Sequence, residues 1–236
     1  MDTALAAAFD ATWPAAEYAR AGGFSVGRGM GGGGRVGSAR ATGPWTGDDI
    51  TAAIQVQQGW DQPPQFRVGD DDQALAQALA ARGLRRHTPT LILAAPVAAL
   101  TGLAIPSVTT FTVWPPMAIQ REIWSAGGIG PARRAIMQRA PQPKTAILGR
   151  TEDRAAGAAF AAVSDGVAMV HAVEVLPGLR RKGLAGWMMR QAAIWGTQQG
   201  ASRIALAVGS GNGAALALYR GLGFAPAGGY AYWQAD

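Results

Sequence analysis

Arg180-Arg181-Lys182-Gly183-Leu184-Ala185 is the stretch that decides the fold. It follows an apolar run, 168–176, that is typical of a strand. It leads into a segment in which apolar residues recur on one helical face, namely Leu184, Trp187, Met188, Ala192 and Trp195. A strand that turns through a glycine-containing loop into a helix presents free backbone N–H groups at the positive end of a helix. The sequence therefore predicts a phosphate-binding loop here.

The composition sets limits on the chemistry. The chain has 236 residues, of which 49% are apolar, enough for one large domain or two small ones. It has no cysteine, which excludes disulfides, thiolate metal sites and thiol catalysis. Its two histidines, His87 and His171, are too few for a histidine-rich metal site, so we expect no metal. We see no signal peptide, and Pro96 and Pro106 interrupt the most apolar window, so we expect a cytoplasmic protein outside the membrane.

The net charge of +6 suggests an anionic partner only weakly. The basic residues come in pairs and triplets, such as Arg85-Arg86, Arg133-Arg134 and Arg180-Arg181-Lys182, and not in the clustered footprint that nucleic acid requires. We therefore expect no nucleic-acid partner. A solvated basic surface is the plain interpretation, and a surface that attracts an anionic cofactor such as coenzyme A is the alternative.

An internal repeat emerges when the sequence is shifted by 140 positions. Val68-Gly69 then falls on Val208-Gly209, Asp72 on Asn212, and Gly83 on Gly223. Arg40-x-x-Gly43 falls on Arg180-x-x-Gly183. The ordered set predicts two copies of one unit, 1–100 and 105–236, with a boundary between Pro96 and Pro106.

The two predicted copies differ at the positions that matter for chemistry. In the first copy, Pro44 follows Gly43 and removes an N–H that a phosphate would need. Trp45 stands where the second copy has Ala185, and Leu79 stands where it has Tyr219. The first copy is therefore predicted to be a scaffold without chemistry.

Hydrophobic patterns predict a fold of the α+β class, a three-layer arrangement in which helices flank a mixed sheet. We expect helices over 3–18, 48–58, 73–82, 117–140 with a break at 127–131, 184–198 and 212–221. We expect strands over 65–68, 88–95, 107–113, 144–149, 155–163, 167–176 and 203–208, and a final strand pair over 224–233. The glycine-rich run 29–34 lacks a strand-to-helix context and is interpreted as a loose turn between two strands.

The second half resembles the GCN5-related N-acetyltransferase (GNAT) superfamily, over about residues 105–236. The resemblance rests on Arg-x-x-Gly-x-Ala after the strand end Val173-Glu174-Val175-Leu176-Pro177, and on Asn212-x-x-Ala215-x-x-x-Tyr219-x-x-x-Gly223-Phe224. With the repeat, it suggests a tandem member of the superfamily whose N-terminal copy is degenerate.

The resemblance implies transfer of an acetyl group from acetyl-coenzyme A to a primary amine of an unidentified acceptor. It implies that the pyrophosphate binds backbone N–H groups of the loop Arg180, Arg181, Lys182, Gly183, Leu184 and Ala185. The pantetheine arm would pair with the backbone of Val173 and Val175, and an N–H near Val173 would polarise the thioester carbonyl. Asn212 would hold the cofactor arm while it caps a helix, although a plain helix cap is the alternative.

Tyr219 is implied as the acid that protonates the departing thiolate, with a packed helix residue as the alternative. For the group that takes the amine proton, we favour His171 over Glu174, with solvent as a third possibility. Strict alternation along the strand would place Glu174 on the face opposite His171 unless a bulge intervenes.

The position of the acceptor pocket and an alternative function can also be stated as expectations. By analogy, the acceptor pocket would involve Tyr230, Tyr232, Trp233 or the segments 114–116 and 127–130. A non-catalytic sensor of acyl-coenzyme A is the alternative function, and we expect a monomer or a homodimer.

Overall fold

The computed structural model describes residues 1–235, which form two compact units. Unit 1 consists of residues 1–13, 92–208 and 212–227. Unit 2 consists of residues 14–91, 209–211 and the chain from Gly228 onward. The units do not coincide with segments 1–100 and 105–236, because the first helix packs in unit 1 and the end of the last strand packs in unit 2. The division of the sequence into two repeated domains stays a prediction.

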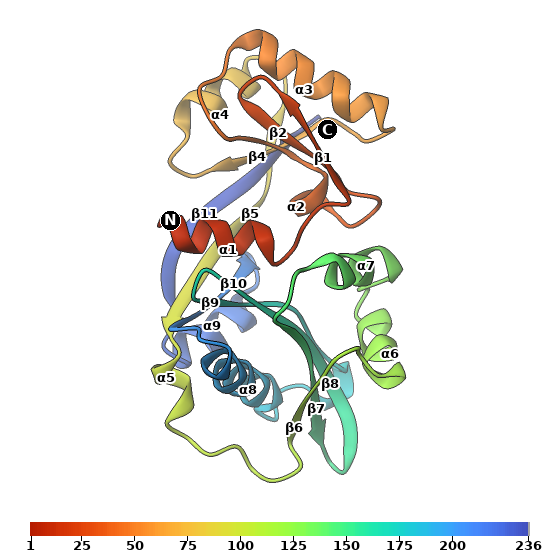
Figure 1. Cartoon of the computed structure of the whole chain (residues 1–236), viewed down its shortest axis with the longest axis vertical. Helices are drawn as coiled ribbons and strands as arrows, with labels where there is room; N and C mark the ends of the chain where they lie inside the picture. Colours follow the sequence, from red (N-terminus) through yellow and green to blue (C-terminus); the bar gives the residue numbers. More distant parts are fainter. Residues whose placement is uncertain (236) are drawn as a thin grey trace. The chain divides into compact units, whose positions relative to one another are not determined.

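Unit 1 contains a mixed sheet with helices on both faces (Figure 1). Its strand order is β11-β5-β10-β9-β8-β7-β6. The strands are β5 (Arg85–Pro96), β6 (Thr110–Val113), β7 (Lys144–Thr151), β8 (Arg154–Ser164), β9 (Val167–Val175), β10 (Arg203–Gly209) and β11 (Ala225–Gln234). The helices are α1 (Thr3–Ala11), α5 (Ala98–Thr101), α6 (Ala118–Ala126), α7 (Pro131–Arg139), α8 (Leu184–Gln198) and α9 (Gly213–Gly221).

Small residues in β8 let α8 approach one face of the sheet of unit 1, and an aromatic pair covers the other face. Residues 156–163 of β8 are buried throughout, and most of them are alanine. On one face, a Cβ added to Gly157 would lie 2.9 Å from the side chain of Met188, so α8 sits directly on the glycine. On the other face, Phe160 packs against Trp13, with ring centroids 6.1 Å apart. Both faces of β8 are therefore covered, as a three-layer arrangement requires.

Helix α1 is fixed to unit 1 by polar contacts at both of its ends. Asp2 caps the helix by accepting a hydrogen bond of 3.0 Å from the N–H of Leu5. The same carboxylate pairs with Arg203 at the start of β10, with a nearest N–O distance of 2.6 Å. Hydrogen bonds from Arg203 are the main reason that the pKa of Asp2 lies well below its usual range. At the other end, the Thr12 hydroxyl lies 2.9 Å from Nε2 of His171 on β9.

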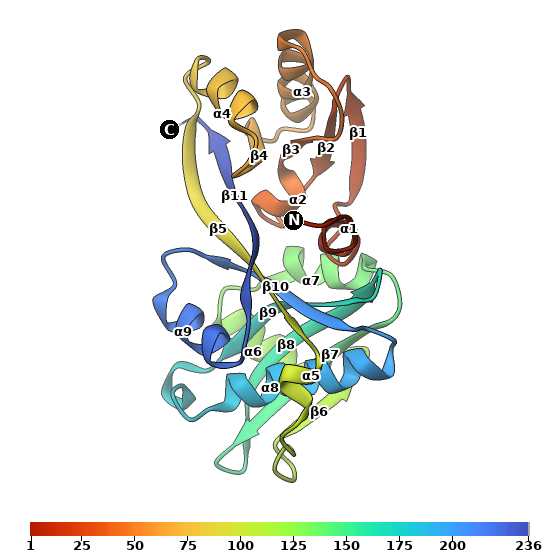
Figure 2. The ribbon, with the colours of Figure 1, turned by 90° about the vertical axis from the view of Figure 1, so that its left-hand side faces the viewer.

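Unit 2 contains the strand order β1-β2-β3-β4-β11-β5 around a core of its own. Its other elements are β1 (Glu17–Ala21), β2 (Phe24–Arg28), α2 (Gly34–Gly37), β3 (Ala39–Ala41), α3 (Gly47–Gly59), β4 (Gln65–Gly69) and α4 (Gln73–Ala80). The core centres on Phe24, Ile50, Phe66, Leu75 and Leu79, each at most 1% exposed. Strands β5 and β11 are neighbours and have residues in both units (Figure 2).

The structure confirms the predicted fold class and corrects several elements. The helix predicted over 3–18 ends at Ala11, because Pro14 and the β-strand that starts at Glu17 follow. The predicted final strand pair over 224–233 is one strand, β11, in which Gly228-Gly229 continues the strand instead of making a turn. The helical break before Pro131 is present, between α6 and α7. The glycine-rich run 29–34 lies between β2 and α2, and β2 pairs antiparallel with β3.

Candidate functional site

The site in unit 1 opens where two parallel strands part. Strand β9 pairs with β10 from Val167↔Arg203 to Val170↔Leu206, and among the described residues the pairing ends there. Strand β9 continues to Val175 and β10 to Gly209. The end of β9 therefore has backbone groups on the β10 side that a ligand can reach. Parallel strands that part in this way leave a wedge-shaped opening at their carboxyl ends, the usual place for a ligand in such sheets.

The loop after β9 presents N–H groups to this opening. Two of its residues have left-handed backbones, Arg181 with φ +66° and Gly183 with φ +78°. Gly183 is the N-cap of α8 and has no side chain to cap the helix. The first intrahelical bond of α8 runs from the N–H of Trp187 to the carbonyl of Gly183, so the N–H groups of residues 184–186 have no acceptor within the helix. The loop and helix start thus form a concave set of donors that suits a phosphate.

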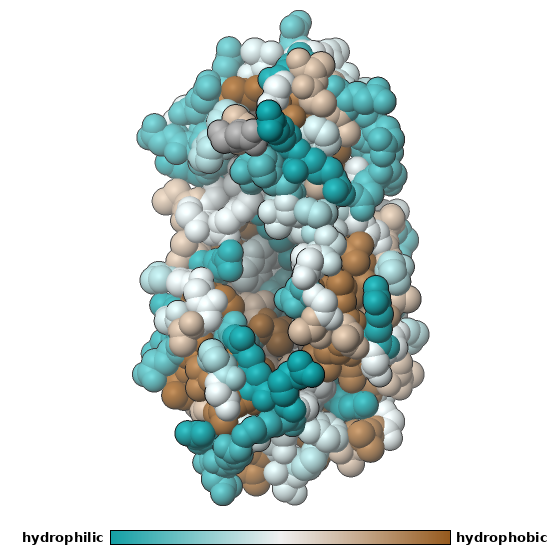
Figure 3. Space-filling model, turned by 180° about the vertical axis from the view of Figure 1, so that it is seen from behind, coloured by the Kyte–Doolittle hydropathy of each residue, from teal (hydrophilic) through white to brown (hydrophobic). Residues whose placement is uncertain are grey.

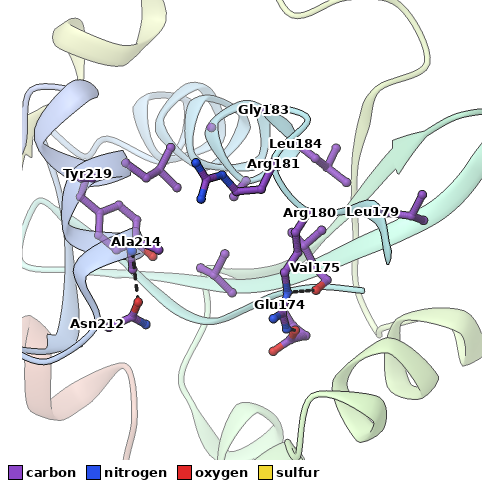
Figure 4. A pocket seen from close by; sticks show the side chains of 16 residues that line it. Glu174, Val175, Leu179, Arg180, Arg181, Gly183, Leu184, Asn212, Ala214 and Tyr219 are labelled. Carbon is purple, nitrogen blue, oxygen red and sulfur yellow. Dashed lines mark hydrogen bonds and ion pairs between the residues drawn. The ribbon is translucent and has the colours of Figure 1, made fainter. Parts of the chain in front are cut away.

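Helix α9 supplies the opposite wall of the opening (Figure 4). Asn212 caps α9 by accepting a hydrogen bond of 3.1 Å from the N–H of Ala215. Tyr219, two turns along the helix, is 7% exposed and packs on Phe224 with ring centroids 5.7 Å apart. Burial raises the pKa of Tyr219 to about 12, so its phenol stays protonated at neutral pH.

A β-bulge in β9 changes which side chains share a face. Strand β8 pairs Phe160 with His171 and Ala158 with Glu174, so two residues of β9 face one residue of β8. Because Phe160 and Ala158 lie on one face of β8, His171 and Glu174 also lie on one face of β9. Ala172, inside the bulge, has a left-handed backbone with φ +53°. The alternation that would separate His171 from Glu174 is therefore broken.

The two candidate bases have different surroundings. His171 is 6% exposed, and its ring lies between Trp13 at 4.9 Å and Phe160 at 6.0 Å, measured between ring centroids. It is not among the residues that line the cavity described below. Glu174 lines that cavity, and its carboxylate lies against the end of α6, where a Cβ added to Gly127 would come within 2.3 Å of it.

Arg180 links Glu174 to the loop before α8. Its guanidinium donates a hydrogen bond of 2.9 Å to the Glu174 carboxylate and one of 2.8 Å from Nε to the carbonyl of Val175. Figure 4 shows this pair on the side of the pocket away from Tyr219. Lys182 of the same loop pairs with Glu152 instead and does not line the cavity.

These residues enclose a cavity of about 610 Å³. Ten of the twelve residues singled out from the sequence line it, and His171 and Lys182 do not. The cavity is also lined by residues that the sequence analysis did not single out as site residues: Leu179, Gly186, Ala214, Ala215, Ala217 and Leu218. Their positions in the sequence could have identified them, because they lie next to the loop motif or between Asn212 and Tyr219. Tyr230, Tyr232 and Trp233, considered for the acceptor pocket, belong to unit 2.

Comparison with known families gives a match over the segment that builds this site. Residues 116–224 match the acetyltransferase (GNAT) family. The match spans α6 to α9, and so includes the parted strands, the loop and Tyr219. No curated protein matches the sequence.

Solved structures share the fold of this chain. A GCN5-related N-acetyltransferase from Kribbella flavida is 21% identical, with a TM-score of 0.68 over 94% of this chain and 90% of that one. A protein of unknown function from Staphylococcus epidermidis is 10% identical, with a TM-score of 0.70 over 96% of this chain and 95% of that one. A tandem GNAT protein from the clavulanic acid biosynthesis pathway is 15% identical, with a TM-score of 0.61 over 84% of this chain and 74% of that one.

Two properties of the described residues bear on partners. None of the helices within residues 1–235 has the length and apolar character needed to cross a membrane. On the face shown in Figure 3, hydrophilic and hydrophobic side chains are interspersed. The absence of a nucleic-acid partner, the cytoplasmic location and the oligomeric state stay predictions.

Proposed function

We propose that this protein is an N-acetyltransferase that moves the acetyl group of acetyl-coenzyme A to a primary amine in the cavity of unit 1. The observation that carries the proposal is one cavity lined both by the unpaired end of β9 and by the uncapped start of α8. The first offers backbone groups to the amides of an extended pantetheine arm. The second offers N–H groups and a positive helix end to a diphosphate. The match to the GNAT family supports this assignment.

Tyr219 is proposed as the acid that protonates the leaving sulfur. It lines the same cavity, and its raised pKa keeps the proton on the phenol until it is needed. Burial also makes the phenol a weaker acid. The same burial raises the proton affinity of a departing thiolate, so donation coupled to breaking of the C–S bond remains favourable.

Glu174 is proposed to take the proton of the amine, directly or through water. A primary alkylamine with a pKa near 10 is mostly protonated at neutral pH and must lose a proton before it attacks. Glu174 lines the cavity, whereas His171 is enclosed by Thr12, Trp13 and Phe160. This assignment reverses the preference for His171 drawn from the sequence.

A thiol-release assay with a panel of primary amines tests the proposed activity. We expect at least one amine to release coenzyme A faster than the amine-free control, and Tyr219→Phe to abolish most of that rate. A protein that binds acetyl-coenzyme A but releases no thiol with any amine would instead be a sensor of acyl-coenzyme A.

We also infer that the chain is a tandem GNAT protein with one working copy. The first segment contains the strand–helix–strand unit β4-α4-β5. The second segment contains the same unit, β10-α9-β11, about 140 positions later in the chain. In unit 2, residues 230–234 of β11 pair with β4, which belongs to the first segment. In unit 1, β5 from the first segment lies beside β10 from the second. The two segments therefore exchange their last strands. Strand β5 of the first segment lies beside β10 of the second, and β11 of the second segment pairs with β4 of the first.

The loop of the proposed first copy is less suited to phosphate than the loop before α8. Helix α3 begins with a capping box in which Thr46 accepts from the N–H of Asp49 and the Asp49 carboxylate accepts from the N–H of Thr46. Two carboxylates, Asp48 and Asp49, lie in its first turn, where α8 has none. Trp45 packs on Phe24 just before the helix, with ring centroids 6.1 Å apart. The capping box uses the N–H groups of Thr46 and Asp49, and the two carboxylates add negative charge where an anion would bind.

A further inference from the structure

Trp124 of α6 is joined to the bulge of β9 by a hydrogen bond. Its indole Nε1–H donates to the carbonyl of Ala172 at 2.8 Å. Trp124 is completely buried, and Ala172 has φ +53°, a backbone that alanine adopts only at a cost. The buried indole N–H therefore has an acceptor, and the carbonyl of the strained residue has a donor. The bond lies at the bulge that interrupts the alternation of side chains along β9.

The helices on the two faces of the sheet show in which direction the carbonyl of Ala172 points. The end of α6 lies against Glu174, on the face of the sheet that also carries Phe160 and His171. Helix α8 packs on the opposite face, over Gly157. Figure 1 shows α6 and α8 on opposite sides of strands β7 to β9. The carbonyl of Ala172 is thus drawn out of the sheet toward α6.

The next N–H must point the other way. In a trans peptide the carbonyl of one residue and the N–H of the following residue are antiparallel. The N–H that shares a peptide with the Ala172 carbonyl belongs to Val173, so it is directed away from α6 and toward the α8 side. Val173 lines the cavity, and so does the start of α8.

We propose that Trp124 is a positioning residue that aims the N–H of Val173 at the thioester carbonyl oxygen. The proposal rests on the proposed function. Without the indole donor, the buried carbonyl of Ala172 would turn to find another donor, and the N–H of Val173 would turn with it, because the peptide is planar. Negative charge that develops on the thioester oxygen would then lose its donor.

Infrared spectroscopy of bound acetyl-coenzyme A, labelled with ¹³C at the thioester carbonyl, tests this without an acceptor amine. A hydrogen bond to the oxygen lowers the C=O stretching frequency, so we expect a lower frequency in the wild-type complex than in solution. Trp124→Phe should remove most of that lowering while the Kd for coenzyme A changes less than about threefold. With an active amine, kcat should fall about 10²-fold or more, which is typical for loss of one oxyanion donor. Trp195→Phe, in α8, is the matched control and should keep the wild-type frequency.

The outcomes separate the two levels of the proposal. If wild-type protein does not bind acetyl-coenzyme A, the proposed function fails and this inference fails with it. If the wild-type protein binds acetyl-coenzyme A and Trp124→Phe gives the wild-type frequency, the role proposed for Trp124 is wrong, while the proposed function stands. Should Trp124→Phe not fold, Trp124→Met removes the same donor, and hydrogen exchange of the indole N–H in the wild-type protein provides a further test. Exchange at the rate of a free indole would overturn the proposal, and strong protection would support it.

Discussion

Asp72 and Asn212, 140 positions apart, cap their helices with the same geometry. The backbone angles are φ −93° and ψ 69° at Asp72, and φ −84° and ψ 73° at Asn212. Each side chain accepts a hydrogen bond of 3.1 Å from the N–H three residues later. The difference between the two caps is charge, since the aspartate is an anion and the asparagine is neutral. Only the neutral cap lines the cavity proposed to bind a polyanionic cofactor.

Exchanging these caps isolates the effect of charge. Aspartate and asparagine cap helices about equally well, so Asn212→Asp should leave folding unchanged. It places a carboxylate in the cavity, and we expect the Kd for coenzyme A to rise several-fold, with a larger effect at low salt. Isothermal titration at two salt concentrations measures this. Asp72→Asn is the control and should not change the Kd, and equal effects of the two variants would refute the assignment of the cavity.

Tyr219→Phe tests the proposed acid. The substitution keeps the ring that packs on Phe224 and removes the hydroxyl. General acid catalysis typically contributes 10²- to 10⁴-fold, so kcat should fall about 10²-fold or more while the KM for acetyl-coenzyme A stays within a few-fold. Steady-state kinetics with an active amine check this. Full activity of the variant would show that the proton comes from another group.

The raised pKa of Tyr219 predicts how stability depends on pH. The group titrates near pH 10 in the unfolded chain and at about 12 in the folded protein. Its contribution is fully present below pH 10 and is lost as the pH rises to 12, because the unfolded chain releases the proton first. The loss is about 2–3 kcal/mol, and Tyr219→Phe should lack it. Denaturant unfolding between pH 9 and pH 12 measures the difference, and parallel pH curves for the two proteins would contradict the burial argument.

Glu174→Gln and Thr12→Val together distinguish the two candidate bases. Glu174→Gln removes the carboxylate from the cavity, and we expect kcat to fall by about 10²-fold. Thr12→Val keeps the shape beside His171 but removes the hydroxyl that lies 2.9 Å from its Nε2, and should change kcat little. The pH profile of kcat checks the assignment. A large effect of Thr12→Val with an active Glu174→Gln would return the role to His171.

Local signals sufficed to predict the fold class and to single out residues that the fold brings together. The loop motif, the caps and the order of strands are short-range features, and ten of the twelve predicted site residues line one cavity. The pairing of the Lys182 side chain with Glu152 could not be predicted from the sequence, because it depends on the β7–β8 hairpin.

The features that were not predicted depend on long-range pairing. The bulge at Ala172 contains no glycine that would indicate it in the sequence. The residue that donates a hydrogen bond to it, Trp124, lies 48 positions away. The pairing of β11 with β4 joins strands about 165 positions apart, and no local pattern specifies it. The contact of Thr12 with His171 requires α1 to pack on unit 1 rather than with the strands that follow it.

The most direct test of the central claim is titration of coenzyme A into the wild-type protein, Gly183→Val and Gly83→Val. Both glycines have left-handed backbones, with φ +78° and +81°, and at both a Cβ would meet nothing closer than 4.0 Å, so the strain of the two variants is matched. We predict one binding site per chain, at least a tenfold loss of affinity for Gly183→Val, and wild-type affinity for Gly83→Val. Equal binding by all three proteins would show that the loop before α8 does not hold the diphosphate.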